Sequence, residues 1–250
     1  VMVSSGLILM YGVFQNRDDH NTLIPMNDFY YNYYHEYPNN LCADAGYGIY
    51  KNYQYIKIHN IGNYVKFQSW EGESSGKYPQ LFYTFDDGVI CLNTCIGEEI
   101  PFNSFCHQRN KEGKLYKFMG CDNCNYTYKC KAKLKNKDRD YRLTELIPQY
   151  ELLKEEARNN LQSPKGIEIR INRSIQVEGT FGQVKQNMQY NRMRRRGIEK
   201  VSCEFMLVCL GVNIRKFFTF LNTKEIKSKY WQKSEKLKKE KFPFPIQKKN

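Results

Sequence analysis

Short apolar runs alternate with helical stripes over the first quarter of the chain. Residues 18–37 and 49–59 place apolar side chains at helical spacing, and Pro38 ends the first of these predicted helices. Three apolar runs have the length of strands: 7–14, 41–43 and 64–68. The order strand, helix, strand, helix, strand predicts an α/β layer.

The rest of the chain changes character twice. Residues 69–140 are rich in Gly, Ser, Asn and Lys and hold six of the nine cysteines, which predicts an insertion with little core of its own. Helical spacing then returns, with a break at Ser163-Pro164. The predicted helices cover 151–161, 168–190 and 203–221. The last of them is apolar on all sides, so we expect it to be buried.

The positive charge is concentrated at the end of the chain. Residues 185–250 hold 18 of the 39 basic residues and only 5 acidic ones, so this quarter carries the whole net charge of +13. Such a segment is typical of a protein that binds nucleic acid. The alternatives are a tail that serves solubility, or a lysine bias from AT-rich codons. No run of 18 apolar residues occurs, which excludes a membrane-spanning helix, and no signal peptide is recognisable.

Asp44 directly follows the predicted strand 41–43, where α/β sheets place functional groups. Its neighbours Ala45, Gly46 and Gly48 are small, so the backbone of a ligand has room to approach. The alternative is a turn aspartate that hydrogen-bonds within its own loop.

Glu178 lies on the predicted helix 168–190, at the edge of an apolar stripe. Gly182 follows one turn later and Lys185 two turns later, so a carboxylate, a gap and a cation lie in line. Two glycines inside a helix cost about 1 kcal/mol each relative to alanine, which indicates that something large approaches there. The alternative is a surface Glu–Lys pair near a loosely packed glycine. The stripe consists of Val177, Phe181, Val184 and Met188.

Four cysteines of the insertion have the spacing of a tetrahedral zinc site. An insertion with little core needs a further source of stability, and a Cys-x2-Cys knuckle is typical of structural Zn²⁺ sites. His107 is an alternate ligand, and the other interpretations are a disulfide pair or plain free thiols. The four predicted ligands are Cys106, Cys121, Cys124 and Cys130.

Several segments resemble the insertion-sequence transposases of the DDE, RNase H-like superfamily. Residues 42–48 resemble the second-aspartate motif, and 177–185 resemble the third-acid helix, with Glu, six residues and then Lys. Further likenesses, before the aspartate and at the end of the domain, cover 11–16, 22–25, 194–200 and 211–216.

In that family two aspartates and a glutamate bind two divalent metal ions. The resemblance therefore implies that Asp44 is the second acid and Glu178 the third, with Mg²⁺ (or Mn²⁺) as cofactor. We expect the two carboxylates to meet at one end of the sheet, close enough to share a metal. Lys185 would contact DNA phosphate near the cut. Further phosphate contacts are expected from the arginines of the following loop: Arg192, Arg194, Arg195 and Arg196.

The chain departs from the family pattern in two ways. Many relatives carry an arginine four residues before the glutamate, where this chain has Ser174, and Arg173 stands one place earlier. The first aspartate of the family belongs on a strand upstream of residue 7. We therefore expect the C-terminal portion of a transposase, inactive by itself, because two acids hold two metal ions poorly.

The expected architecture is α/β, a partial RNase H-like fold with a mixed sheet, a cysteine-rich insertion and a helical C-terminal part. Its expected parts are a core with Asp44, the insertion, a helical part with Glu178 and a basic tail, over 1–68, 69–140, 141–221 and 222–250. The expected activity is metal-dependent DNA cleavage and strand transfer at insertion-sequence ends, by a homo-oligomer in the cytoplasm, associated with the nucleoid. The alternatives are a non-enzymatic, zinc-stapled basic module that binds nucleic acid, or a decayed transposase remnant.

Overall fold

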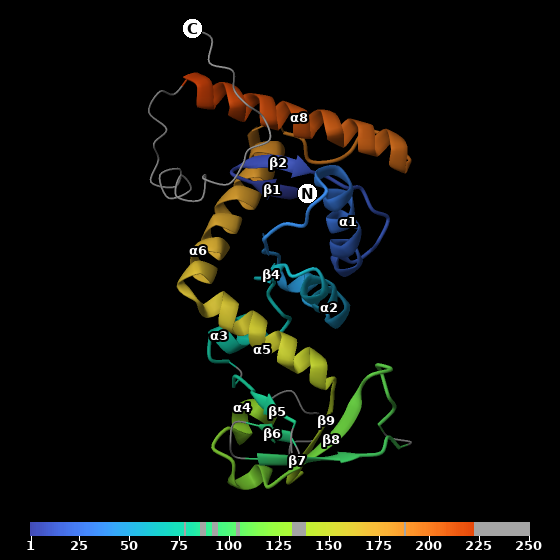
Figure 1. Cartoon of the computed structure of the whole chain (residues 1–250), viewed down its shortest axis with the longest axis vertical. Helices are drawn as coiled ribbons and strands as arrows, with labels where there is room; N and C mark the ends of the chain where they lie inside the picture. Colours follow the sequence, from blue (N-terminus) through green and yellow to red (C-terminus); the bar gives the residue numbers. More distant parts are fainter. Residues whose placement is uncertain are drawn as a thin grey trace. The chain divides into compact units, whose positions relative to one another are not determined.

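The chain divides into two compact units, each built from helices and strands (Figure 1). The central unit is Phe14–Glu178, and the terminal unit combines Val1–Val13 with Gly179–Asn250. The chain is thus a mixed α/β protein, as predicted and as a partial RNase H-like fold requires. The computed structural model describes residues 1–77, 79–85, 89–91, 95–103, 106–131, 139–187 and 189–222.

The first half of the central unit alternates short helices and short strands. The predicted helices 18–37 and 49–59 are confirmed, although each is shorter than its apolar pattern, because turns occupy the ends. The elements are α1 (Leu23–Tyr34), β3 (Asn40–Leu41), α2 (Tyr50–Ile58), β4 (Gly62–Asn63) and α3 (Trp70–Ser74).

β3 and β4 form a parallel pair whose hydrogen bonds run beyond the labelled strands. The N–H of Tyr64 donates to the carbonyl of Leu41 at 2.9 Å, and the N–H of Lys66 donates to the carbonyl of Ala43 at 3.2 Å. The strand predicted at 64–68 is therefore wrong in its bounds, because the pairing is centred on earlier residues and ends at Lys66.

The main core of the central unit lies between α2 and α5 (Pro148–Gln162). Tyr53 of α2 and Ala157 and Leu161 of α5 have no exposed side-chain surface. The Tyr53 hydroxyl donates to the carbonyl of Val65 at 2.7 Å, which ties the helix to the chain after β4. The predicted amphipathic helix 151–161 is confirmed.

The cysteine-rich region forms a five-stranded antiparallel sheet in the order β5-β6-β7-β8-β9. Its core is small, as the sequence predicted, and consists of Tyr116, Phe118 and Leu146 with half-buried neighbours. The sheet continues past residue 140, since β9 pairs along the whole of β8. The strands are β5 (Tyr83–Thr84), β6 (Val89–Cys91), β7 (Cys95–Ile100), β8 (Lys114–Met119) and β9 (Tyr141–Leu146). Between β8 and β9 lie the 3₁₀ turn η3 (Cys121–Asn123) and the helix α4 (Thr127–Lys131).

The central unit ends in the helix α6 (Pro164–Arg173) followed by a π-helix, η4 (Ser174–Glu178). Ser163 separates α5 from α6, as predicted, and its hydroxyl accepts the N–H of Gly166 at 3.0 Å as an N-cap. The helix predicted at 168–190 therefore exists, but it changes from α to π hydrogen bonding before Glu178.

In the terminal unit, a hairpin packs against a long helix. The hairpin is β1 (Met2–Ser4) and β2 (Leu7–Met10), and the remaining elements are α7 (Gly179–Gly182), the π-helix η5 (Gln183–Asn187) and α8 (Ile198–Asn222). Ile8 of β2 is buried against Val208 and Val212 of α8. Asn213 fixes this contact, because its side chain accepts the N–H of Ile8 at 2.9 Å and donates to the Ile8 carbonyl at 2.8 Å.

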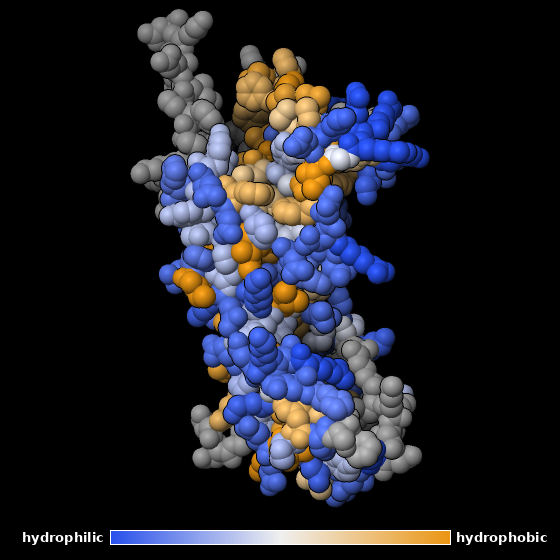
Figure 2. Space-filling model, turned by 90° about the vertical axis from the view of Figure 1, so that its right-hand side faces the viewer, coloured by the Kyte–Doolittle hydropathy of each residue, from blue (hydrophilic) through white to orange (hydrophobic). Residues whose placement is uncertain are grey.

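The prediction that the helix 203–221 is buried on all sides is wrong. Leu207, Phe217 and Phe218 are 59%, 54% and 57% exposed. Hydrophobic side chains gather over α8 at the top of Figure 2. The reason is that a two-stranded hairpin and a short helical segment cover only one face of a 25-residue helix. Among the residues that the structure describes, no helix has the length and apolar character needed to cross a membrane.

Candidate functional site

Asp44 stands at the carboxyl end of the parallel pair, one residue after Ala43 accepts the last of the hydrogen bonds described above. Its backbone is extended, and its carbonyl accepts the N–H of Tyr47 at 3.0 Å, where the 3₁₀ turn η2 (Ala45–Tyr47) begins. Its side chain makes no capping hydrogen bond to that turn. The carboxylate is therefore not used by its own loop, which argues against a turn aspartate.

Two cations face the Asp44 carboxylate. Arg173 Nη2 lies 3.4 Å from Oδ2, and Lys66 Nζ lies 4.0 Å from Oδ1. The Asp44 side chain remains 60% exposed, so solvent or a ligand reaches it while the cations orient it. Because exposed ion pairs contribute little to stability, the significance of these contacts is the charge that they place beside the carboxylate.

A third cation, Arg170, stands close to the same strand end. Burial raises the pKa of the Cys42 thiol, and Arg173, Lys66 and Arg170 act in the opposite direction. The Arg170 guanidinium packs over the ring of Trp70, 5.5 Å from its centroid. Sequence reasoning missed Lys66 and Arg170 as site residues. The available signal was the i, i+3 spacing of Arg170 and Arg173 on one helix face.

A π turn separates Arg173 from Glu178. It is the last residue of α6, and Ser174 begins the π-helix that ends at Glu178. A π turn closes between residues i and i+5, so it contains one residue more than an α turn. Arg173, five residues before Glu178, therefore lies one π turn before it. In an α-helix, the residue one turn before the glutamate would be the one four positions earlier. The π turn absorbs the departure from the family spacing.

The two glycines after Asp44 have different surroundings. A Cβ added to Gly48 would lie 2.2 Å from the Lys66 carbonyl oxygen and 2.7 Å from Phe67 Cα, whereas nothing lies within 4 Å of a Cβ on Gly46. Gly48 is thus required by the close approach of the chain's own backbone. Of these two glycines, only Gly46 leaves the open space that the sequence predicts for a ligand.

Glu178 is exposed at the end of the central unit, and no hydrogen bond or ion pair to it occurs within the described residues. Gly179 and Gly182, which follow it, have nothing within 4 Å of an added Cβ, in agreement with an open helix face. The meeting of Asp44 and Glu178 stays a prediction. So does the in-line arrangement of Glu178 and Lys185, which belong to different units.

The apolar stripe of this helix is only partly buried. Val184 is 7% exposed and packs in the core of the terminal unit, whereas Val177 and Phe181 are half-buried. Met188 lies outside the described residues. The stripe was predicted from a spacing of 100° per residue, and two π segments interrupt that spacing.

A divalent metal finds an incomplete set of ligands in the described residues. Asp44 offers oxygens of the kind that Mg²⁺ prefers, but its nearest partners are cations rather than further acids. Nowhere in the described part of the chain do three His, Cys, Asp or Glu side chains form a group able to hold a metal ion. The residues present therefore do not by themselves fit the two-metal arrangement that the resemblance implies.

The predicted phosphate-binding residues lie in the terminal unit, on η5 and on the loop before α8. Their side chains are exposed, and the Lys185 ammonium lies over the ring of Phe181 at 5.9 Å. Across the described residues none of the four arginines has a side-chain ion pair. The residues are Lys185, Arg192, Arg194, Arg195 and Arg196, and we call them the basic loop.

Glu204 of α8 anchors the basic loop. Its carboxylate accepts the N–H of Arg194 at 2.9 Å and the N–H of Arg195 at 2.9 Å. The Tyr190 hydroxyl donates to the same carboxylate and holds the pKa of Glu204 below its ordinary value. The acid binds main-chain groups, and the charge of Arg195 also acts to lower the pKa of Glu204. Sequence reasoning missed Glu204, for which an isolated acid in a basic segment was the only signal.

The predicted zinc ligands do not all come together. Cys121, Cys124 and Cys130 line one small cavity, and the fourth cysteine there is Cys95. Cys106 lies in a separate turn, where it forms an isolated antiparallel bridge with Asn103. The ligand set inferred from spacing is therefore not the set that the fold gathers.

One comparison with known proteins finds a family match over slightly less than half of the chain. Residues 99–218 match the family described as "Transposase DDE domain". No curated protein and no solved structure matches the chain significantly. The matched segment includes Glu178 and the basic loop, whereas Asp44 precedes it.

Proposed function

Because residues 99–218 match the family described as "Transposase DDE domain", we propose that this chain is part of a DDE transposase that acts in DNA strand cleavage and transfer at the ends of an insertion sequence. The proposed catalytic carboxylates are Asp44 and Glu178. The observation that carries this proposal is the position of Asp44. It follows the end of a parallel strand pair, its side chain makes no hydrogen bond to its own turn, and Arg173 orients its carboxylate.

Each residue of the proposed site has a task that its surroundings support. Arg173 orients the Asp44 carboxylate, and Lys66, whose ammonium pairs with Glu71 at 2.6 Å, adds positive charge beside it. The open helix face at Gly179 and Gly182 leaves room for the bulk of a nucleic acid. A DNA backbone is the kind of ligand that needs both a close approach and positive charge.

Mg²⁺ or Mn²⁺ is the cofactor that the family implies. When bound, such ions activate the attacking oxygen and stabilise the leaving oxygen of a phosphodiester. The described residues do not complete a site for them, so we draw no step through the metal. For the same reason we expect the 250-residue chain not to nick a plasmid that carries the cognate ends. Mg²⁺- or Mn²⁺-dependent nicking that Asp44→Ala abolishes would contradict this expectation.

The catalytic assignment is tested by transposition in cells. The assay counts movements of a marked insertion sequence when the transposase that contains this chain is supplied. Asp44→Asn and Glu178→Gln should each lower the frequency by roughly 1000-fold or more, because removal of one catalytic group removes most of the catalysis. Glu168→Gln, an exposed acid on α6, is the matched control and should leave the frequency unchanged. Normal transposition with Asp44→Asn would refute the proposal.

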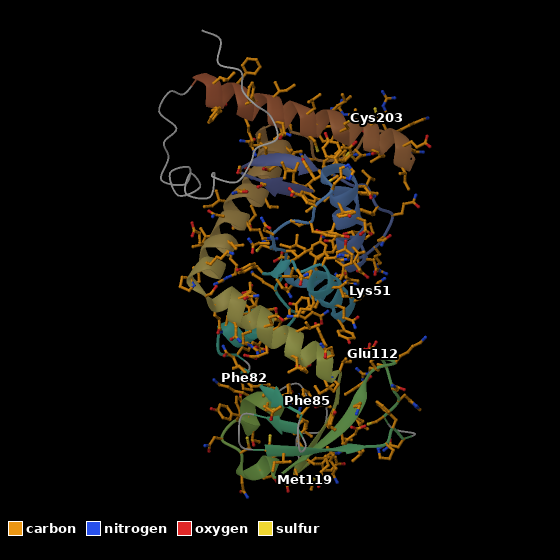
Figure 3. The ribbon with its side chains drawn as sticks, viewed as in Figure 1. Lys51, Phe82, Phe85, Glu112, Met119 and Cys203 are labelled. Carbon is orange, nitrogen blue, oxygen red and sulfur yellow. The ribbon has the colours of Figure 1, made fainter. Side chains whose placement is uncertain are left out.

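DNA is the proposed partner, and the basic loop is its proposed contact. Each phosphate contact contributes about 0.9 to the slope of log affinity against log salt. Replacement of Arg194 and Arg195 by Ala should therefore lower that slope by about 2, measured by fluorescence anisotropy on duplex DNA. Lys51→Ala is the matched control, since Lys51 is an exposed cation on α2 (Figure 3). An unchanged slope in the double variant would remove the basic loop from the DNA interface.

DNA binding without cleavage is a second candidate function, because the described residues form no metal-binding group of acids. In that case the chain binds DNA through the basic loop without cutting it. DNA binding together with unimpaired transposition of the Asp44→Asn variant would favour this alternative. Homo-oligomerisation on DNA and association with the nucleoid stay predictions.

A further inference from the structure

Four cysteines from three parts of the sheet region line one small cavity. β7 contributes Cys95, the turn after β8 contributes Cys121 and Cys124, and α4 contributes Cys130. The cavity has a volume of about 20 Å³, close to the space that one water molecule needs. It lies next to the end of β8, where Figure 3 labels Met119. A space of this size suits a single ion and is too small for an organic ligand.

Backbone geometry presents two of these thiols as a knuckle. Gly120 has a left-handed backbone, with φ of 72°, which turns the chain sharply at the end of β8. The N–H of Cys121 then donates to the carbonyl of Asp140 at 3.2 Å, and the N–H of Cys124 donates to the carbonyl of Cys121 at 3.3 Å. A Cys-x2-Cys turn fixed in this way is how structural zinc sites present two thiolates.

Arg142 brings a cation into the same cavity. Its Nη1 donates to Cys130 Sγ at 2.9 Å. A guanidinium is always charged, so this contact places a permanent cation beside one of the four sulfurs. β8 and β9 pair Arg142 with Phe118, which also lines the cavity. The pairing of β8 with β9 therefore places the Arg142 guanidinium beside the four cysteines.

We propose that Cys95, Cys121, Cys124 and Cys130 bind one Zn²⁺ ion, with Arg142 hydrogen-bonded to the Cys130 thiolate. Four thiolates around Zn²⁺ carry a net charge of −2, which the guanidinium partly neutralises. Sulfur donors select a soft metal such as zinc over the hard Mg²⁺. The site is separate from the proposed catalytic carboxylates and does not depend on them.

Binding must draw the sulfurs together. No three metal-ligating side chains of the described residues already form a group that holds a metal. The four thiols line one cavity, and zinc holds sulfur ligands at roughly 2.3 Å, so binding requires a rearrangement of these side chains. Since the core of the sheet is limited to a few side chains, the ion would order this region when it binds.

Zinc analysis of cysteine variants tests the ligand set. The full 250-residue chain is purified under reducing conditions, and the zinc content is measured by mass spectrometry. We expect one zinc per chain in the unmodified protein and in Cys106→Ser, the matched control. Cys95→Ser and Cys124→Ser should lower zinc affinity by more than about 100-fold, and Arg142→Ala by about 10-fold to 100-fold.

Cobalt titration of the unmodified chain provides a measurement that does not depend on how a variant folds. The thiolate-to-cobalt charge-transfer band should have the intensity of four sulfur ligands. A band of two sulfurs or none would overturn the proposal, as would an absence of zinc after incubation of the reduced protein with the metal. Zinc that is lost in Cys106→Ser and retained in Cys95→Ser would restore the ligand set predicted from spacing.

Discussion

Gly48→Ala tests whether the loop that carries Asp44 is held by the close approach of two backbone segments. The added Cβ would lie 2.2 Å from the Lys66 carbonyl oxygen, where contact needs about 3.4 Å, so one segment must move by about 1 Å. Movement is costly because Phe67, the next residue, is 1% exposed in the main core. The Gly48 carbonyl also accepts the Tyr150 hydroxyl at 2.6 Å, which fixes the loop from the other side.

The expected magnitude follows from these contacts. Overpacking of a closely packed position costs about 1–3 kcal/mol, and we expect the upper half of that range, because both clashing atoms are backbone. The lower entropy of the unfolded alanine variant returns about 0.4–1 kcal/mol. The net loss of unfolding free energy is about 2 kcal/mol. For a unit of this size that corresponds to a decrease of about 4–8 °C in Tm.

Urea denaturation measures this loss, with the fluorescence of the buried Trp70 as the signal. Gly46→Ala is the matched control, because it changes the same loop at a position where an added Cβ meets nothing within 4 Å. We expect the control to lie within about 0.5 kcal/mol of the unmodified protein. If the two variants unfold at the same urea concentration, the argument from close backbone approach is refuted.

Two further predictions concern the packing of α5 and the anchor of the basic loop. Leu161→Ala should lower the unfolding free energy by about 2–5 kcal/mol in urea titrations, because Leu161 is fully buried, whereas Leu152→Ala, at a position 53% exposed, should cost far less. Glu204→Ala should speed amide exchange at Arg194 and Arg195, whose N–H groups the carboxylate accepts. Because the pKa of Glu204 is lowered on folding, this protection should be fully present above the ordinary value of 4.5 and lost as the pH falls through the lowered pKa. Unchanged exchange in the variant would exclude Glu204 as the anchor.

Local patterns predicted the helices well. α1, α2 and α5 appear where apolar spacing placed them, and the break at Ser163 lies where a cap and a proline follow each other. These features depend on residues within one or two turns, which is why the sequence sufficed. The position of Asp44 after a strand was predictable for the same reason, since the apolar run 41–43 and the polar turn after it are adjacent.

Features that depend on distant partners were predicted less well. The apolar character of α8 indicated burial, but burial requires a second surface, and the hairpin covers one face only. The run 64–68 has the composition of a strand, yet its pairing with β3 begins at Gly62. Spacing selected Cys106 as the fourth thiol, whereas the pairing of β7 with β8 and the turn that follows gather Cys95 instead. None of these partners is near in sequence.

The π turn before Glu178 has a consequence for the alignment of related chains. A π turn accommodates one inserted residue within a helix, so no loop is needed. The insertion changes only the local pattern of backbone hydrogen bonds. An alignment that requires the arginine four residues before the glutamate finds Ser174 at that position. It would score this chain as lacking the arginine. An alignment that counts helical turns would place Arg173 opposite that arginine.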